Sequence, residues 1–492
     1  MISPDFSAFK RLARKGNRVA FVRTIPADLE TPVSSFLKLS RKSEHVFLLE
    51  SAEQEQKIGR YSFMGSDPKL TLTSREGIFT SFRNGRTRVE KGFQSFPDLI
   101  KKILTEFKIA NPEALSGFSG GFVGYLGYEN VESFEKVNLE KRPGPSFPDA
   151  LFFFVEDFLI FDHFRKTLSV VELVPVEPGQ NLKKTYDRAC RSIAKRTAEL
   201  KRPLVLPSKK NSKTKISIQS NTTKKAFCAK VNRVKEYIRA GDCIQVVLSQ
   251  RFSMPAKSVD GFQIYRALRS INPSPYMFYF KSGKFQVIGT SPELLVKKTG
   301  AEAEVRPIAG TRPRGETPAQ DAAFEETLKK SPKEMAEHLM LVDLGRNDLG
   351  RVCKFDSIRV KSFARTERYS HVMHLVSDVT GTLQKGKDAF ALLKAAFPAG
   401  TVTGAPKIRA MQIINELESE KRGPYAGSLG YFSFNGDMDM CITIRTLFSD
   451  GKKIYLQAGA GIVKDSAPEK EYQETVNKAK ALFKAIARRG EF

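Results

Sequence analysis

The sequence of 492 residues contains no tryptophan, although it has 37 phenylalanines and 13 tyrosines. It has only five cysteines, and none of them forms a CxxC pair, which argues against a disulfide framework and against a zinc site and favours reduced thiols. No apolar run is long enough to cross a bilayer, and the basic N-terminus lacks the apolar segment of a secretory signal. We therefore expect a cytoplasmic protein with no membrane contact.

Acidic residues are scarce relative to basic ones: 81 lysines and arginines face 54 aspartates and glutamates, a formal net charge of +27. Such an excess is typical of proteins that bind nucleic acid or another anion. The lysines are spread over the whole chain, however, and no RNP, zinc-finger or basic-helix pattern is present. We predict a generally basic surface and no nucleic-acid partner, with a field that could steer a small dianionic substrate.

The chain is long enough for two or three domain-sized units, and a hydrophobic content of 41% allows a large core. Residues 1–205 are predicted to form a strand-rich α/β unit. Residues 206–225, rich in Lys, Ser, Thr and Asn, are the best candidate linker. A second unit of strands and helices is predicted over 226–490.

Near the C-terminus the pattern predicts a strand meander over Ser428–Phe434, Met440–Phe448 and Ile454–Val463. A helix starting with Pro406 at its first position is predicted upstream, and a final helix is predicted over Pro468–Arg488.

Residues Glu334–Leu344 are predicted to form a helix that is apolar nearly all round, and such a helix is usually buried. Glu337 lies inside it, and Glu334 lies one turn earlier on the same side. A buried carboxylate must be protonated, paired or bound to a metal. A structural ion pair with one of the neighbouring arginines explains these residues as well as a metal site does.

Glu471 and Glu474 repeat the same three-residue spacing at the start of the last predicted helix. Acidic residues are favoured near a helix N-terminus in any case, because of the helix dipole. If the two acidic helices faced each other, they would offer carboxylate oxygens and no soft ligands. That donor set suits Mg²⁺, which commonly binds through one or two carboxylates.

Other residues suggest a site for a small anion. Arg445 is predicted to lie in mid-strand, where it would pair either with a ligand carboxylate or with a core acidic residue. Gly459 and Gly461 lie in the next strand, and glycine within a strand often marks close approach of a ligand. His374 has apolar neighbours and is, on local evidence, more typical of a core residue than of a catalyst. The residues alone favour an enzyme that acts on a small carboxylate through Mg²⁺.

Several motifs resemble the chorismate-binding enzymes: PIAGTRPRG, EHLMLVDLGRNDL, FPAGTVTGAPKIRAM, CITIR, QAGAGIV and APEKEYQETVNKA. LLES, GRYSFMG and NPSPYMF resemble the large subunits of anthranilate synthases in particular. The resemblance runs from about Asn17 to Ala487. It implies a large α/β (α+β) sandwich in which antiparallel sheets pack orthogonally with helices outside.

The resemblance also implies residue roles. Glu337 and Glu474 would bind Mg²⁺ at the C1 carboxylate of chorismate, with Glu471 as a further acidic residue. The substrate would be held by Gly310, Thr311, Tyr425, Arg445, Gly459, Ala460 and Gly461. Thr401 would lie near the ammonia path, Glu334 would be the general acid for the departing C4 hydroxyl, and His374 would assist loss of the C2 proton with expulsion of pyruvate.

Ala309 separates the relatives, because aminodeoxychorismate synthases commonly carry a nucleophilic lysine at that position. An isochorismate synthase would use water in place of ammonia, and these two activities are the alternatives within the family. The anthranilate synthase resemblance implies feedback inhibition by tryptophan at a pocket formed by Glu50, Ser51, Pro275, Tyr276, Met277 and Cys441. The missing tryptophans suit a protein made when tryptophan is scarce, although a compositional accident explains them too.

The sequence shows no glutamine amidotransferase domain after the last helix. The resemblance therefore implies a separate amidotransferase subunit, in a heterodimer or heterotetramer. A basic binding protein that kept the fold without the chemistry is the remaining hypothesis, and the intact pairs Glu334/Glu337 and Glu471/Glu474 argue against it.

Overall fold

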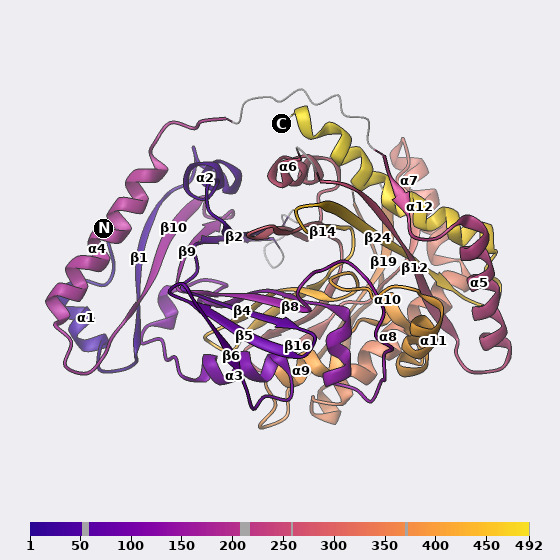
Figure 1. Ribbon diagram of the computed structural model, residues 1–492, viewed down its shortest axis with the longest axis horizontal. Coiled ribbons are helices and arrows are strands. Elements are labelled where there is room, and N and C mark those ends of the chain that lie inside the picture. The colour runs from indigo at the N-terminus through magenta and orange to yellow at the C-terminus, as the bar shows by residue number, and fades with distance from the viewer. Residues whose placement is uncertain (52–58, 207–216, 257–258, 370–371, 492) are drawn as a thin grey trace.

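The fold is a sandwich of two antiparallel sheets covered by helices (Figure 1). The structure is a computed structural model, and it describes residues 1–51, 59–206, 217–256, 259–369 and 372–491. Within these residues each sheet has twelve strands, and all pairings between named strands are antiparallel.

The first sheet contains strands from both ends of the chain. Its order is β1 (Arg18–Pro26), β10 (Thr167–Pro175), β9 (Asp157–Asp162), β3 (Tyr61–Ser66), β2 (His45–Glu50), β13 (Tyr276–Ser282), β14 (Phe285–Ser291), β23 (Thr446–Ser449), β24 (Lys453–Ile462), β12 (Gln245–Pro255) and β11 (Gln219–Ser220), and β20 (Gly404–Ala405) also pairs with β12.

The second sheet is assembled in the same mixed way. Its order is β17 (Ile308–Pro313), β19 (Val372–Thr382), β16 (Glu302–Val305), β15 (Leu294–Thr299), β22 (Met438–Ile442), β21 (Ser428–Ser433), β7 (Gly121–Leu126), β8 (Ala150–Val155), β4 (Leu70–Arg75), β5 (Ile78–Arg83) and β6 (Arg86–Glu90), and β18 (Arg359–Arg368) pairs with β19.

Helices cover the outer faces of both sheets, as Figure 1 shows. The helices that pack on the first sheet or its neighbours are α1 (Phe6–Leu12), α2 (Pro32–Leu39), α4 (Leu182–Leu200), α5 (Lys224–Arg239), α6 (Gly261–Ile271), α10 (Gly400–Thr403), α11 (Lys407–Leu417) and α12 (Pro468–Ala487). The others are α3 (Phe96–Thr105), α7 (Pro318–Lys329), α8 (Pro332–Gly350) and α9 (Ala389–Ala396). Short 3₁₀ turns lie at η1 (Pro112–Ala114), η2 (Tyr128–Ser133), η3 (Phe355–Ser357) and η4 (Arg488–Glu491).

The sandwich follows from the two-residue period of the strands, since successive side chains point to opposite faces. In β2, Val46 and Leu48 join the core beneath the helices, whereas Phe47 joins the core between the sheets. Phe280 of β13 and Phe153 of β8 stack across the two sheets with ring centroids 4.4 Å apart. The predicted class, antiparallel sheets with outer helices, is confirmed.

The predicted division at residues 206–225 stays a prediction. Residues 207–216 lie outside the described part, and the remainder includes β11 and the start of α5. Strands from both sides of this segment share both sheets.

The prediction that the helix around Glu337 is buried was wrong in part. α8 buries one face, formed by His338, Leu341, Val342, Gly345, Asp348 and Leu349. Leu339 on the opposite face is 49% exposed. Apolar residues all round a helix therefore do not imply burial when only one face meets the sheet.

The single strand predicted over Met440–Phe448 is two strands. β22 ends at Ile442 in the second sheet, and β23 begins at Thr446 in the first. Arg445 lies between the two strands with φ +50°, in the left-handed region outside the β range, so its mid-strand placement was wrong.

Pro406 is the N-cap of α11 rather than its first helical residue, and the short helix α10 forms within the predicted loop before it. All five cysteines are free thiols. In the described part of the chain, no helix has the length and apolar character needed to span a membrane.

Candidate active site

Two connections, in which the chain passes from one sheet to the other, lie at the centre of the site; we call them crossings. The link from β14 to β15 contains Glu293, and the link from β22 to β23 contains Arg445. The links are hydrogen-bonded to each other: the Ile442 N–H donates to the Glu293 carbonyl (3.0 Å), and the Thr290 N–H donates to the Arg445 carbonyl (3.2 Å). The crossings therefore hold a carboxyl group and a guanidinium group in one region between the sheets.

Glu337 and Glu474 approach this region from different helices. Glu337 is on α8, which packs on the second sheet, and Glu474 is on α12, which packs on the first. Burial raises the pKa of Glu337, and the negative charges of Glu334 and Glu474 raise it further. The structure thus brings the two predicted metal ligands within electrostatic range of each other.

These carboxylates fit a divalent cation. The Oε1 atom of Glu337 accepts a hydrogen bond from Gln245 Nε2 (2.9 Å), which leaves the mutual repulsion of the carboxylates in place. The described residues contain no cluster of three metal-binding side chains, and the predicted ligands are the two carboxylates of Glu337 and Glu474. Oxygen donors in that number suit Mg²⁺, which keeps other positions for water and substrate.

Glu471 belongs to the same acidic group. It lies one turn before Glu474 on α12. Burial raises the pKa of Glu471, and the nearby charge of Glu474 raises it as well. A hydrogen bond from Ser466 lowers this pKa but does not cancel the rise.

Glu334 forms an ion pair with Arg312, whose NH1 lies 3.1 Å from Oε1. The structural ion-pair interpretation therefore holds for this residue. Gly310 lies against the same carboxylate: its φ is +66°, and a Cβ atom at this position would be 3.1 Å from Glu334 Oε2. A bare backbone is required there for both reasons.

The His374 ring is oriented by β17. Its Nδ1 lies 2.8 Å from the Gly310 carbonyl oxygen and 3.1 Å from Thr311 Oγ1. Because a carbonyl only accepts, Nδ1 carries the hydrogen, and Nε2 keeps a lone pair. Burial lowers the pKa of His374, and the cations Arg445 and Lys478 lower it further. The hydrogen bond to the Gly310 carbonyl acts in the opposite direction and raises the pKa. The imidazole is therefore a neutral base at neutral pH.

Arg445 and the neighbouring strand β24 form a candidate contact region for an anion. In the described chain Arg445 forms no ion pair, and its NH1 donates to the Lys478 carbonyl (3.2 Å). A Cβ atom at Gly459 would lie 2.8 Å from the hydroxyl of Tyr425, and one at Gly461 would lie 2.7 Å from an amide nitrogen. Tyr425 and Gln245 therefore pack directly against bare backbone at these two positions, where a side chain would not fit.

Ala460 lies between these two glycines, and its side chain is fully buried with the α5 and α11 core. Only its backbone can face the site. Lys464, just beyond β24, is exposed.

Sequence reasoning missed Glu293, although an acidic residue directly before an apolar strand was a usable signal. Glu293 is buried beside the hydroxyl of Thr401 and the ammonium of Lys478. Burial raises the pKa of Glu293 to about 8, although the hydrogen bond from Thr401 and the charge of Lys478 both act to lower it. At neutral pH it is therefore a carboxylic acid that can give up a proton.

Lys478 and Gln245 were also missed. Lys478 Nζ lies 2.7 Å from Glu474 Oε1 and donates to the Gly459 carbonyl (2.9 Å). Its spacing of four residues after Glu474 on one helix was the available signal. Gln245, at the start of β12, had no pattern that distinguished it from other strand residues.

A separate cavity of about 440 Å³ contains all six residues predicted for an inhibitor pocket: Glu50, Ser51, Pro275, Tyr276, Met277 and Cys441. Burial raises the pKa of Glu50, although Arg269 lies 3.2 Å from its carboxylate. The Ser51 hydroxyl is buried and has no hydrogen-bond partner among the described residues.

Comparison with known proteins identifies the family. The sequence model of the family described as chorismate binding enzyme matches residues 44–484. The chain belongs to the chorismate-binding enzymes. It is 44% identical to anthranilate synthase component 1 of Acetivibrio thermocellus over 499 residues, covering 100% of both chains. It is 47% identical to the protein of the same name from Aquifex aeolicus, covering 97% of this chain and 96% of that one.

Solved structures of chorismate-binding enzymes share the fold. Anthranilate synthase component I from Streptococcus pneumoniae superposes with a TM-score of 0.76 at 34% identity, covering 93% of this chain and 98% of that one. The menaquinone-specific isochorismate synthase of Escherichia coli gives a TM-score of 0.71 at 21% identity, with 98% and 99% covered, and shows likeness of fold alone.

The raised pKa of Glu293 predicts how this chorismate-binding enzyme responds to pH. Between pH 4.5 and about 8 the folded state holds a proton that the unfolded chain releases. This group therefore lowers the free energy of unfolding by at most about 1.4 kcal/mol per pH unit as pH rises. The neutral side chain of a Glu293→Gln variant removes that slope, so the variant gains stability relative to the wild type from pH 5 to 8.

Urea unfolding at each pH measures the difference. Glu326→Gln, on the exposed part of α7, is the control and should show no such trend. A stability difference between Glu293→Gln and wild type that stays constant from pH 5 to 8 would show that Glu293 does not hold the proton.

Proposed function

We propose that this chain is the chorismate-binding component of an anthranilate synthase, a lyase that converts chorismate and ammonia to anthranilate, pyruvate and water. The observation that carries the proposal is the convergence of the Arg445–Tyr425 pocket and the Glu337/Glu474 pair in one site. Full-length identity of 41–47% to proteins named anthranilate synthase component 1 supports it.

The two parts of the site suit the two carboxylates of chorismate. Arg445, Tyr425 and the β24 backbone offer a cation and polar groups to the enolpyruvyl carboxylate. The other substrate carboxylate would face Glu337 and Glu474, which repel it, so this contact requires a cation between them. When bound there, Mg²⁺ would supply a Lewis acid that links this carboxylate to the protein and polarises the ring.

The first stage forms a bond from ammonia to C2 while the C4 hydroxyl leaves, and that hydroxyl needs a proton to depart as water. Glu334 was the candidate from the sequence, and its carboxylate forms an ion pair with Arg312. Glu293 carries a proton at neutral pH, and we assign the donor role to it. The proton lost by the attacking ammonia balances the one delivered to the hydroxyl.

The second stage breaks the C2–H bond and the bond from C3 to the enolpyruvyl oxygen. Nε2 of His374 is free to take the C2 proton. The C–H electrons complete the aromatic ring, and the leaving enolpyruvate gains a proton to become pyruvate. Aromaticity makes this stage downhill.

The same neighbourhood suits direct attack by ammonia. Ala309 offers no lysine nucleophile, which disfavours the aminodeoxychorismate route. The hydroxyl of Thr401 lies next to the Glu293 carboxyl, and we propose that ammonia reaches C2 past this residue. Ammonia would come from glutamine through a separate amidotransferase subunit, in a heterodimer or heterotetramer, as the words "component 1" in the relatives' names suggest.

The 440 Å³ cavity is proposed to bind tryptophan as a feedback inhibitor. The free hydroxyl of Ser51 and the buried carboxylate of Glu50 could bind the amino acid's polar groups. Leu294 and Cys441 line the cavity, and each adjoins one of the two sheet crossings that carry the catalytic groups. Occupancy of the cavity would thereby act on the site through the crossings.

The primary test is turnover. Purified chain incubated with chorismate, Mg²⁺ and an ammonium salt at mildly alkaline pH should produce blue anthranilate fluorescence, since all groups required for amination are on this chain. EDTA should abolish the signal, and glutamine should not replace ammonium in the absence of a second subunit. Chorismate consumption without fluorescence would contradict the proposal, and product mass would then identify aminodeoxychorismate or isochorismate.

A His374→Asn variant provides the internal control for the second stage. Loss of a general base lowers rates about 10²- to 10⁴-fold, so anthranilate formation should fall by that factor. An aminated product that retains the enolpyruvyl group should accumulate and be detected by its mass. Anthranilate released at the wild-type rate would remove His374 from the mechanism.

Inhibition tests the cavity. A single hydrogen bond contributes about 0.5–1.5 kcal/mol, so Ser51→Ala should raise the tryptophan concentration for half inhibition about 2- to 12-fold, with each variant's uninhibited rate as its reference. Ser35→Ala, a buried serine on α2 outside the cavity, should not. If millimolar tryptophan leaves the wild type fully active, the cavity is not an inhibitor site.

A further inference from the structure

We propose that Arg422, held by Glu418, is a positioning residue that fixes Tyr425 and thereby the pocket for the substrate carboxylate. The inference rests on the proposed function, because it assigns the clamp a role in binding chorismate. The sequence pattern singled out neither Arg422 nor Glu418.

The clamp is a buried ion pair with two parallel hydrogen bonds. The side chain of Arg422 is 2% exposed and that of Glu418 is 8% exposed. Arg422 Nε donates to Glu418 Oε2 (2.9 Å), and NH2 donates to Oε1 (2.7 Å). This fork geometry is available to arginine and not to lysine.

The remaining donors of Arg422 reach two other segments of the site. NH1 donates to the carbonyl of Val402 (2.7 Å), the residue after Thr401 in α10. NH2 donates to the carbonyl of Val247 (2.8 Å), two residues after Gln245 in β12. One guanidinium therefore joins the segments that carry two site residues, Thr401 and Gln245.

The face of the same guanidinium supports Tyr425. The centre of the Arg422 guanidinium lies 5.6 Å from the centroid of the Tyr425 ring, and the hydroxyl of that ring lies beside Gly459. Burial alone would lower the pKa of Arg422, but the charge of Glu418 offsets this, and the net pKa is raised. The cation thus persists beneath the tyrosine at every pH where the enzyme would work.

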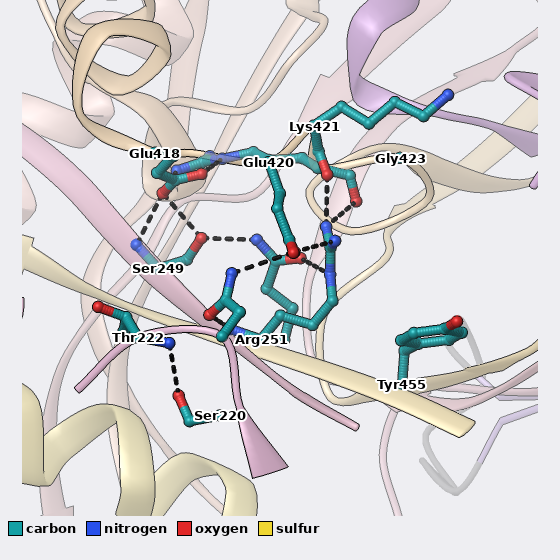
Figure 2. A network of polar contacts seen from close by, with 12 residues as sticks. Ser220, Thr222, Ser249, Arg251, Glu418, Glu420, Lys421, Gly423 and Tyr455 are labelled. Atoms are coloured by element: carbon teal, nitrogen blue, oxygen red, sulfur yellow. Dashed lines mark hydrogen bonds and ion pairs between the residues drawn. The ribbon is translucent and has the colours of Figure 1, made fainter. Parts of the chain in front are cut away.

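Glu418 is itself anchored to the first sheet. Its Oε1 accepts hydrogen bonds from the backbone N–H and the hydroxyl of Ser249, each 2.8 Å (Figure 2). The Ser249 hydroxyl also accepts from Gln457 Nε2 of β24 (2.7 Å). The position of the clamp is therefore set by β12 and β24, the strands that bound the carboxylate pocket.

Arg251 provides a matched control in the same network (Figure 2). Its side chain is 5% exposed and pairs with Glu420 at 2.7 Å, with a further bond to Gln457 at 3.0 Å. Its other donors reach the carbonyls of Lys421 and Arg422. Arg251 is thus a buried, paired arginine of β12, and its side chain reaches neither Tyr425 nor the α10 segment.

The test compares Arg422→Lys with Arg251→Lys in the full chain. Lysine keeps the charge but loses the fork and the contact with the ring, so Arg422→Lys should raise KM for chorismate about tenfold while kcat changes less. Arg251→Lys should leave KM within about twofold, even where the two variants lose similar thermal stability. An equal KM for Arg422→Lys and wild type, or equal shifts in both variants, would overturn the proposal.

A double-mutant cycle with Tyr425→Phe examines the route of the effect. If Arg422 acts through the tyrosine, the fold-increase in KM of the double variant will be well below the product of the fold-increases of the two single variants. Single effects that multiply would show independent roles and overturn the proposal.

Two further measurements keep the test decisive. Should Arg422→Lys fail to fold, Glu418→Gln weakens the clamp without removing its shape and should also raise KM for chorismate. An unchanged KM in Glu418→Gln would overturn the inference.

If the wild type forms no anthranilate, the proposed function fails, and calorimetric binding of chorismate replaces KM. Weaker binding to Arg422→Lys than to Arg251→Lys would then support the clamp, and equal binding would overturn it.

Discussion

The site depends on two neighbouring places where the chain leaves one sheet and enters the other. An ordinary strand pair keeps its residues within one layer, with alternate side chains on each face. The β14–β15 and β22–β23 links break that pattern and bond to each other between the layers. They therefore put Glu293 and Arg445 where neither sheet alone could put them, and helices from both outer faces add the remaining groups.

Electrostatics then divides the site. On one side the cations of Arg445 and Lys478 favour an anionic ligand, and on the other Glu337 and Glu474 repel one another. A dicarboxylate substrate can satisfy both sides only if a cation accompanies it. In the absence of that cation, Lys478 offsets the charge of Glu474 and leaves Glu337 beside its like-charged neighbours.

Much of this could be predicted from sequence where local patterns suffice. The ExxE spacing on two helices drew attention to the pairs Glu334/Glu337 and Glu471/Glu474, from which the family resemblance selected Glu337 and Glu474. The strand pattern predicted the C-terminal meander that contains β21 to β24. Arg445 was misplaced because the strand-like sequence of Met440–Phe448 gave no sign of the positive φ between β22 and β23. The exposed face of α8 was missed because composition shows which residues are apolar but not which face meets a sheet.

Glu293 could not be assigned from sequence for a different reason. Its pKa depends on burial between two sheets and on Thr401 and Lys478, which are distant in the chain. The network around Arg422 likewise joins residues from η2, β12, α10 and β24, and only the assembled sandwich brings them together. Long-range packing, rather than local propensity, decides both.

We propose that Glu337 and Glu474, from helices on opposite sheets, together bind one Mg²⁺ with the substrate. Calorimetric titration of Mg²⁺ into the full chain with chorismate present tests it most directly, using Glu337→Gln, Glu474→Gln and the exposed Glu469→Gln of α12 as the control. We expect saturable binding of one Mg²⁺ by the wild type and by Glu469→Gln, and loss of that binding in both Glu337→Gln and Glu474→Gln. Wild-type affinity in either Glu337→Gln or Glu474→Gln would contradict it.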